Sequence, residues 1–314
     1  MTRLLALATA TAVVALAAAC SALDQETQRV DDAPPPWTPR PKPSVPDRGQ
    51  SPGLFPVRSG RINALVTVVD GDTGRRIHGA RVVIGKRAGY ANRRGLAYVR
   101  VQRPAPLEVR VSKPGYGTRT VRLPLQRNRR GTIRLYRTDL QWPVYGANPQ
   151  RTNAHLGIRL RPPFRVVWSR GLGSLVEFPA VVHEGVAFVG NYKGTIYAIE
   201  MRRGRVVWRY DPPGGKMASS PAVVGEDVVV HGMDGIVRVL NRRNGRLRWQ
   251  HSVGSPIESS PLVAGGVDYF GAWNGRIYAL DLRRRAIRWS YATGAKVTSS
   301  AALHRGTLYI GDYA

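Results

Sequence analysis

Apolar and polar residues alternate along much of the chain after residue 60, and glycine-containing turns interrupt the alternation. Between residues 60 and 137 this pattern predicts short strands over 62–69, 80–84, 95–101, 107–111, 120–125 and 132–135. A period of two is that of a half-buried strand, and short strands at intervals of about 8–12 residues are typical of a β-sandwich. We therefore expect residues 58–137 to form a small sandwich.

The second half of the chain is an internal repeat. Tryptophans recur at intervals of 40, 41 and 40 residues, at Trp168, Trp208, Trp249 and Trp289. Each of the last three follows a glycine by 14 residues, and β-branched segments fill the space between. A unit of about 40 residues with several short strands and no helical periodicity predicts a propeller blade. The indoles are expected to dock neighbouring blades; a row of aromatic ligand platforms is the alternative.

The repeat unit, a glycine-led strand such as Gly275-Arg-Ile-Tyr-Ala-Leu280 followed by a turn and the tryptophan, resembles the propeller repeat of pyrroloquinoline-quinone (PQQ) enzymes and their non-catalytic relatives. The opening 142–153, WPVYGANPQRTN, also looks like the start of such propellers. The resemblance covers residues 138–314 and implies seven or eight blades. About four fit here, so we expect an incomplete propeller, truncated at the C-terminus. Departures from the repeat are His231, Arg285 and Ala301.

The predicted sandwich resembles the carboxypeptidase regulatory-like domain, an Ig-like accessory module of exported bacterial proteins. The resemblance rests on turn motifs such as 69–74, VDGDTG, and 111–116, VSKPGY. Asp70 and Asp72 are expected to shape a turn, because two carboxylates without an acidic third ligand make a poor calcium loop. The fold class is therefore all-β, with an Ig-like sandwich followed by a partial PQQ-like β-propeller.

The N-terminus has the pattern of an export signal. Arg3 precedes an uncharged run of 16 residues, which is shorter than the roughly 20 needed to span a bilayer. Residues 1–19 are thus expected to be a signal peptide. The segment before Cys20 resembles a bacterial lipoprotein signal, which implies lipidation of Cys20. Ala17 stands where such signals usually carry Leu, so ordinary cleavage is the alternative. The Pro-rich segment 20–57 predicts an extended tether.

The formal charge is +28, from 48 Lys and Arg against 20 Asp and Glu, and only six of the basic residues are Lys. Segment 58–137 alone carries 20 basic and three acidic residues, a net of +17. For an exported protein this charge indicates an anionic envelope surface, phospholipid or wall polymer, as the partner and not nucleic acid. The candidate contacts are outward-facing strand arginines and paired turn arginines: Arg100, Arg110, Arg122, Arg202, Arg203, Arg242, Arg243, Arg283 and Arg284.

Candidate chemistry is sparse. Cys20 is the only cysteine, the acids lie mostly in turns or at strand ends without ligand spacing, and the six histidines form no cluster. The PQQ dehydrogenases would imply vicinal cysteines and a calcium site of Glu, Asn and Asp. We expect no catalytic residue, metal or cofactor. The predicted function is a monomeric, lipid-anchored envelope scaffold, facing the periplasm or cell exterior, that binds proteins or anionic polymers. The alternatives are a PQQ-dependent dehydrogenase and an extracellular sensing module.

Overall fold

A computed structural model describes residues 61–102, 107–123, 130–155, 157–158 and 160–314. These residues form an all-β structure, as the sequence predicts, with one 3-10 turn, η1 (Thr138–Leu140). In the described ranges, no helix has the length and apolar character that crossing a membrane would need. The signal, Cys20 and the tether lie outside the described residues.

The first sheets form a sandwich. One sheet has the order β4 (Leu96–Gln102), β1 (Arg61–Asp70), β7 (Arg130–Leu135), and the other β3 (Arg87–Tyr90), β2 (Arg81–Ile84), β5 (Leu107–Ser112), β6 (Arg119–Leu123). Only the β1–β7 pair is parallel. Alternate residues of both sheets, such as Val66, Val82, Val99 and Val109, form the core. Strand β3 was not predicted, because its four residues are mostly exposed and carry no apolar alternation.

Asp70 closes the first turn of the sandwich. One carboxylate oxygen accepts hydrogen bonds from the backbone N–H of Asp72 (3.0 Å) and Thr73 (2.8 Å), and the other accepts one from the Tyr116 hydroxyl (2.9 Å). Burial opposes ionisation of Asp70, but these donors outweigh it and lower its pKa. The carboxylate is therefore used by the turn itself.

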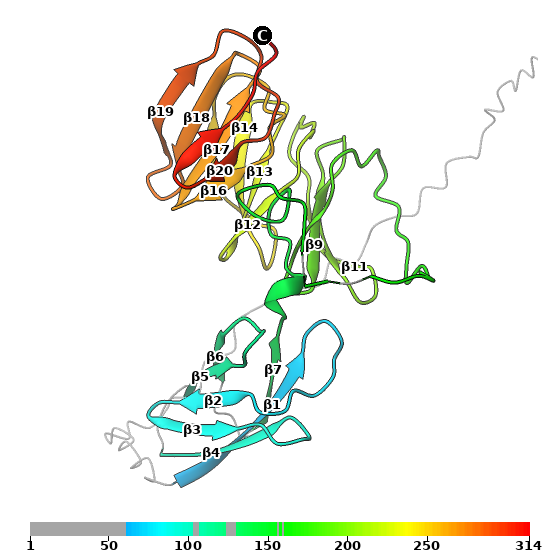
Figure 1. Cartoon of the computed structure of the whole chain (residues 1–314), viewed down its shortest axis with the longest axis vertical. Helices are drawn as coiled ribbons and strands as arrows, with labels where there is room; N and C mark the ends of the chain where they lie inside the picture. The colour runs from blue at the N-terminus through cyan, green and yellow to red at the C-terminus, as the bar shows by residue number, and fades with distance from the viewer. Residues whose placement is uncertain (1–60, 103–106, 124–129, 156, 159) are drawn as a thin grey trace, which may run out of the picture. The chain divides into compact units, whose positions relative to one another are not determined.

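Beyond residue 180 the chain forms antiparallel sheets whose strands follow one another in chain order (Figure 1). Three have four strands and the fourth has two. Their strands are β8 (Val181–His183), β9 (Val186–Gly190), β10 (Ile196–Glu200) and β11 (Arg205–Tyr210); β12 (Ala222–Val224), β13 (Asp227–His231), β14 (Ile236–Asn241) and β15 (Leu247–Ser252); β16 (Leu262–Ala264), β17 (Val267–Ala272), β18 (Arg276–Asp281) and β19 (Ala286–Ala292); and β20 (Ala302–His304) and β21 (Thr307–Tyr309). Four-stranded antiparallel units of this kind are the blades of a partial PQQ-like propeller.

This topology gives each blade two different edges. The first-to-second and third-to-fourth strand turns share one edge, where backbone bonds such as Arg242 N–H to the Glu226 carbonyl (2.9 Å) join them. We call this the arginine edge: residues 183–186, 201–205, 224–227, 241–246, 264–267, 281–286 and 304–307. The second-to-third loops and the connections between sheets share the other, for example through Trp273 N–H to the Pro256 carbonyl (3.0 Å). We call this the aromatic edge: residues 191–195, 211–221, 232–235, 253–261, 273–275, 293–301 and 311–314.

Segment 142–151 pairs with the first strand of the first, second and fourth sheets. Trp142 exchanges two backbone bonds with Val182 in β8, and the carbonyls of Pro143 and Pro149 accept from Val223 in β12 (2.7 Å) and Leu303 in β20 (2.8 Å). The segment thereby occupies backbone groups that an edge strand would otherwise leave unpaired.

Arg151 completes this segment. Its guanidinium donates to the carbonyls of Pro261 (3.0 Å) and Ala301 (2.9 Å), which precede β16 and β20, and to the carbonyl of Tyr145. Burial lowers the pKa of Arg151 to about 10, so the group stays charged at neutral pH. Arg151 therefore ties the opening of the propeller sequence to the third and fourth sheets.

Serines join the blades in series. The Ser220 N–H donates to the Ser260 hydroxyl (3.0 Å), and the Ser260 N–H donates to the Ser300 hydroxyl (2.8 Å), across 40 residues in each case. Ser220 and Ser260 are fully buried. A buried backbone N–H needs an acceptor, so this hydroxyl at a fixed place in the repeat explains why the Ser-Ser pair recurs.

Candidate functional site

The repeated tryptophans dock one blade on the next. The Trp168 indole N–H donates to the Met201 carbonyl (2.6 Å), and the Trp208 indole N–H donates to the Arg242 carbonyl (2.8 Å). Each indole lies over a turn glycine with positive φ; a Cβ on Gly245 (φ 71°) would lie 2.6 Å from the Trp208 ring. The turn glycine thus serves both the backbone conformation and the close approach of the ring. The indoles of Trp168 and Trp208 are therefore hydrogen-bonded to, and in contact with, the third-to-fourth strand turn of the sheet that follows each of them in the chain.

The third and fourth tryptophans differ. The turn that follows Trp249 has Arg285 in the glycine position, in a left-handed conformation (φ 58°). Trp249 packs against the same buried cluster as Leu282 and Ile287, and within the described residues its indole N–H makes no hydrogen bond of the kind made by Trp208. Trp289 is 44% exposed and lies 6.0 Å, between ring centroids, from Tyr269 of its own sheet.

Arg242 is not a free surface cation, contrary to the prediction. Its guanidinium pairs with Glu184 of the first sheet (2.9 Å) and Glu226 of the second (3.2 Å), and its side chain is only 12% exposed. Burial opposes ionisation of Glu184, but the hydrogen bond and charge of Arg242 outweigh it and hold the Glu184 pKa below its usual value. Arg242 therefore clamps two blades together.

The remaining turn arginines differ in their pairing. Arg243 is exposed but pairs with Glu226 (2.7 Å). Within the described part of the chain, a further group of exposed turn arginines on this edge forms no ion pair within 4.0 Å: Arg202, Arg203, Arg205, Arg246, Arg283, Arg284, Arg285 and Arg305. Guanidinium groups without carboxylate partners leave this edge positive.

The predicted sandwich arginines are exposed but do not share a face. Arg100 lies on β4 in one sheet, whereas Arg110 on β5 and Arg122 on β6 belong to the other. Because the two sheets enclose the core, outward-facing side chains from different sheets point to opposite sides. Arg122 also lies opposite Glu108 in the register. The sandwich therefore presents two separate basic faces and not one.

A buried acid–histidine pair joins the second and third sheets. His231 Nε2 lies 2.8 Å from a carboxylate oxygen of Asp268, its Nδ1 lies 2.6 Å from the Ser259 carbonyl, and both side chains are fully buried. A carbonyl only accepts, so Nδ1 carries a proton and a second proton lies between the ring and the carboxylate. The other carboxylate oxygen of Asp268 has no partner among the described atoms.

This pair is not among our predictions from the sequence, although acids near strand ends and histidines outside any motif are what we expected. Asp268 is inside β17, and 37 residues separate it from His231. A sequence signal existed at both positions: His231 stands where Gly190 and Gly271 occur, and Asp268 stands where Val228 occurs. A polar residue at a repeat position where the other repeats have glycine or an apolar residue could thus have indicated that these two side chains pair in the interior.

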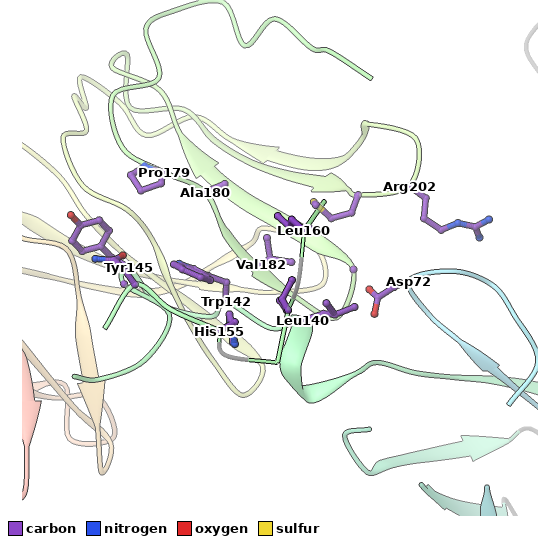
Figure 2. A pocket seen from close by; sticks show the side chains of 15 residues that line it. Asp72, Leu140, Trp142, Tyr145, His155, Leu160, Pro179, Ala180, Val182 and Arg202 are labelled. Atoms are coloured by element: carbon purple, nitrogen blue, oxygen red, sulfur yellow. The ribbon is translucent and has the colours of Figure 1, made fainter. Parts of the chain in front are cut away.

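A pocket borders the first strand of the first blade (Figure 2). Trp142, Tyr145 and His155 line one side of it, and Pro179 and Val182 line the other. Trp142 and His155 lie 5.2 Å apart between ring centroids, and His155 Nε2 is hydrogen-bonded to the Gln141 carbonyl (2.7 Å). One ring nitrogen of His155 is used by the backbone, and these side chains form a largely apolar wall.

The residues described do not fit the quinone and calcium that the resemblance implies. No group of three His, Cys, Asp or Glu side chains in these ranges could hold a metal ion. Arg151 brings a cation to the inner ends of the blades, whereas a calcium site needs several oxygen ligands with net negative charge.

Residues 164–314 match the family model described as PQQ_2, outer membrane protein assembly factor BamB. Among curated proteins, no sequence match was found. Similar solved structures include BamB from Moraxella catarrhalis (20% identity, TM-score 0.44; 48% of this chain and 50% of that one) and quinohemoprotein alcohol dehydrogenase from Comamonas testosteroni (24%, 0.43; 48% and 27%). The computationally designed Ika4 protein is also similar (16%, 0.44; 48% and 94%). The alignment thus spans half the length of the Moraxella protein.

Proposed function

We propose that this protein is a non-catalytic scaffold of the bacterial envelope that binds anionic surfaces through the arginine edge of its blades. The observation that carries the proposal is the group of exposed arginines without carboxylate partners, among them Arg283, Arg284 and Arg285 in one turn. A guanidinium binds phosphate oxygens in pairs and is weakly hydrated, so clustered free arginines favour phosphate-bearing surfaces.

The match of residues 164–314 to a model named for an outer-membrane assembly factor supports an envelope location and protein partners. We propose the remaining domain organisation from the sequence: Cys20 is a lipid anchor, residues 20–57 are a tether, and residues 58–137 are a carboxypeptidase regulatory-like module. One of the two basic faces of that module at a time would add contacts with an anionic surface. A scaffold binds its partners through accessible surfaces more than through a pocket, and the blades have two accessible edges.

The test is co-sedimentation of the full chain with vesicles at low salt. Cys20→Ser removes the site of lipid attachment, so that binding reports the folded part alone. We expect binding to vesicles of phosphatidylglycerol and phosphatidylcholine, no binding to phosphatidylcholine alone, and loss of binding as salt rises.

The variant Arg283→Gln/Arg284→Gln/Arg285→Gln should weaken this binding by about a hundredfold at low salt, since three charges near a surface are removed, each contributing about 1 kcal/mol. Arg242→Gln is the matched control, because its guanidinium is already paired with Glu184 and Glu226. Equal binding by the triple variant and the parent chain would exclude the arginine edge as the contact surface.

A further inference from the structure

The aromatic edge carries a large side chain at one fixed position of each repeat. The second-to-third strand loops place Tyr192, Met233, Trp273 and Tyr313 there. In every blade the backbone N–H of this residue donates to a carbonyl of the connection before the sheet, at 2.8–3.0 Å, so the four side chains are set in the same way. Tyr192 is 42% exposed, Trp273 39% and Tyr313 72%. The edge therefore presents a row of partly exposed rings.

Lysines accompany these rings. Only six lysines occur in the chain, and the three beyond residue 158 all lie on this edge: Lys193, Lys216 and Lys296. The Lys216 ammonium is 5.8 Å from the Tyr192 ring centroid, and the Lys296 ammonium is 3.3 Å from that of Trp273 and 5.7 Å from that of Tyr313. In a chain that elsewhere uses arginine, this placement is specific to the edge.

The Trp273 cluster is organised before any ligand arrives. The indole N–H donates to the Glu258 carboxylate (3.1 Å), and Lys296 lies 4.0 Å from the same carboxylate. The Lys296 side chain nevertheless remains 37% exposed, so the ammonium keeps N–H directions open to solvent. Rings held in place lose little conformational entropy on binding, which favours them as contact residues.

We propose that the aromatic edge binds a carboxylated polysaccharide. A pyranose ring offers an apolar C–H face that lies flat on an indole or phenol, and its carboxylate accepts hydrogen bonds from an ammonium group. A polymer repeats both features, as the edge repeats Tyr192 with Lys216 and Trp273 with Lys296. Two weak subsites on one rigid row act together on one chain, which raises the overall affinity.

Charge and residue choice favour this ligand over a phosphate-rich one. Lysine is a compact cation; the Lys296 ammonium, 3.3 Å from the Trp273 centroid, occupies the centre of one indole face, so a sugar would stack on the part of the ring that remains exposed. The edge also carries Asp211, Asp234, Glu258 and Asp312 against its three lysines, a formal net charge of −1, whereas the arginine edge is positive, so a ligand held mainly by charge would prefer the arginine edge. Recognition here therefore depends on stacking, with the ammonium groups selecting an acid sugar.

The experiment is titration calorimetry of the full chain, with Cys20→Ser, against polygalacturonate. Neutral dextran is the comparison ligand and polyphosphate the probe for the arginine edge. We expect binding of polygalacturonate, and about a tenfold loss in Lys216→Met/Lys296→Met, because methionine keeps the stem and removes the charge. Trp273→Ala should give a similar loss, with thermal unfolding showing that the blades remain folded. Arg283→Gln/Arg284→Gln should change polygalacturonate binding less than twofold.

The proposal is overturned if the parent chain does not bind polygalacturonate, or binds dextran equally well. It is also overturned if the lysine variant binds like the parent, or if the arginine variant loses as much affinity as the lysine variant. The vesicle experiment tests the arginine edge. Binding or lack of binding to polygalacturonate at the aromatic edge therefore does not change the outcome of the test of the scaffold function.

Discussion

The two edges of the same blades use cations in opposite ways. On the arginine edge, turns place guanidinium groups next to one another, and one of them, Arg242, is drawn into ion pairs between blades. On the aromatic edge, lysines lie on exposed rings, as Lys296 does on Trp273. Both edges come from the same repeat, so the difference arises from which loops the antiparallel order brings together.

The comparison teaches that repeated basic residues need not share a role. Docking of Trp208 over Gly245 joins neighbouring blades at the arginine edge, and the serine series joins them at the other edge. The arginines of the Gly245 turn differ: Arg242 and Arg243 pair with acids, whereas Arg246 forms no ion pair within the described ranges. The aromatic edge carries partly exposed rings, among them Tyr192, Trp273 and Tyr313. The arginine edge therefore combines contacts between blades with positive charge, and the aromatic edge offers rings on which a ligand can stack.

The largest effect is expected where the arginine edge holds the blades. Trp208→Ala removes a side chain that is 8% exposed and its bond to the Arg242 carbonyl, and should lower the free energy of unfolding by about 3–5 kcal/mol. Denaturant unfolding measures this. The matched Trp289→Ala removes a 44% exposed indole and should cost far less; equal losses would refute inter-blade docking as the role of Trp208.

The next largest loss of stability is expected at the buried pair of His231 and Asp268. Asp268→Ala leaves His231 without its carboxylate in a fully buried place, and should destabilise the chain by about 3 kcal/mol. The double change His231→Gly/Asp268→Val restores residues found at these repeat positions and should recover part of the loss. A double variant no more stable than Asp268→Ala would contradict a pair that acts as a unit.

Arg242 and Arg243 are neighbours in one turn but have different environments: Arg242 pairs with acids of two blades, whereas Arg243 is exposed. Arg242→Met should cost about 1–3 kcal/mol, because it leaves Glu184 and Glu226 without this partner. Arg243→Met removes a side chain that is 71% exposed and should change stability by less than about 0.5 kcal/mol. Thermal unfolding of both variants at low and high salt distinguishes them, and similar costs would erase the proposed distinction.

Low pH should weaken the ion pair between Arg242 and Glu184. The pKa of Glu184 is lower in the folded chain than its ordinary value of 4.5, so its ionised form contributes stability above that pH. This contribution is lost as pH falls below 4.5 and through the folded pKa. In Glu184→Gln the corresponding part of the acid destabilisation should disappear. Identical pH profiles of unfolding for the variant and the parent would rule out a stabilising role for the Glu184 charge.

The smallest effect on stability is expected on the aromatic edge. Lys296→Met removes one partly exposed cation from Trp273 and should cost at most about 1 kcal/mol. Its effect on polygalacturonate binding should be much larger than its effect on unfolding. A loss of several kcal/mol would instead make Lys296 a structural residue.

The sequence by itself determined the all-β class, the period of about 40 residues and most strands, since alternation and turn glycines are local properties of the chain. It did not predict β3, whose exposed residues carry no apolar pattern. Only the tertiary structure decided that Arg100 and Arg110 lie on different sheets, that Arg242 binds acids 58 and 16 residues away, and that Asp268 meets His231. Those outcomes depend on which strands and turns become neighbours, which only the assembled sheets determine.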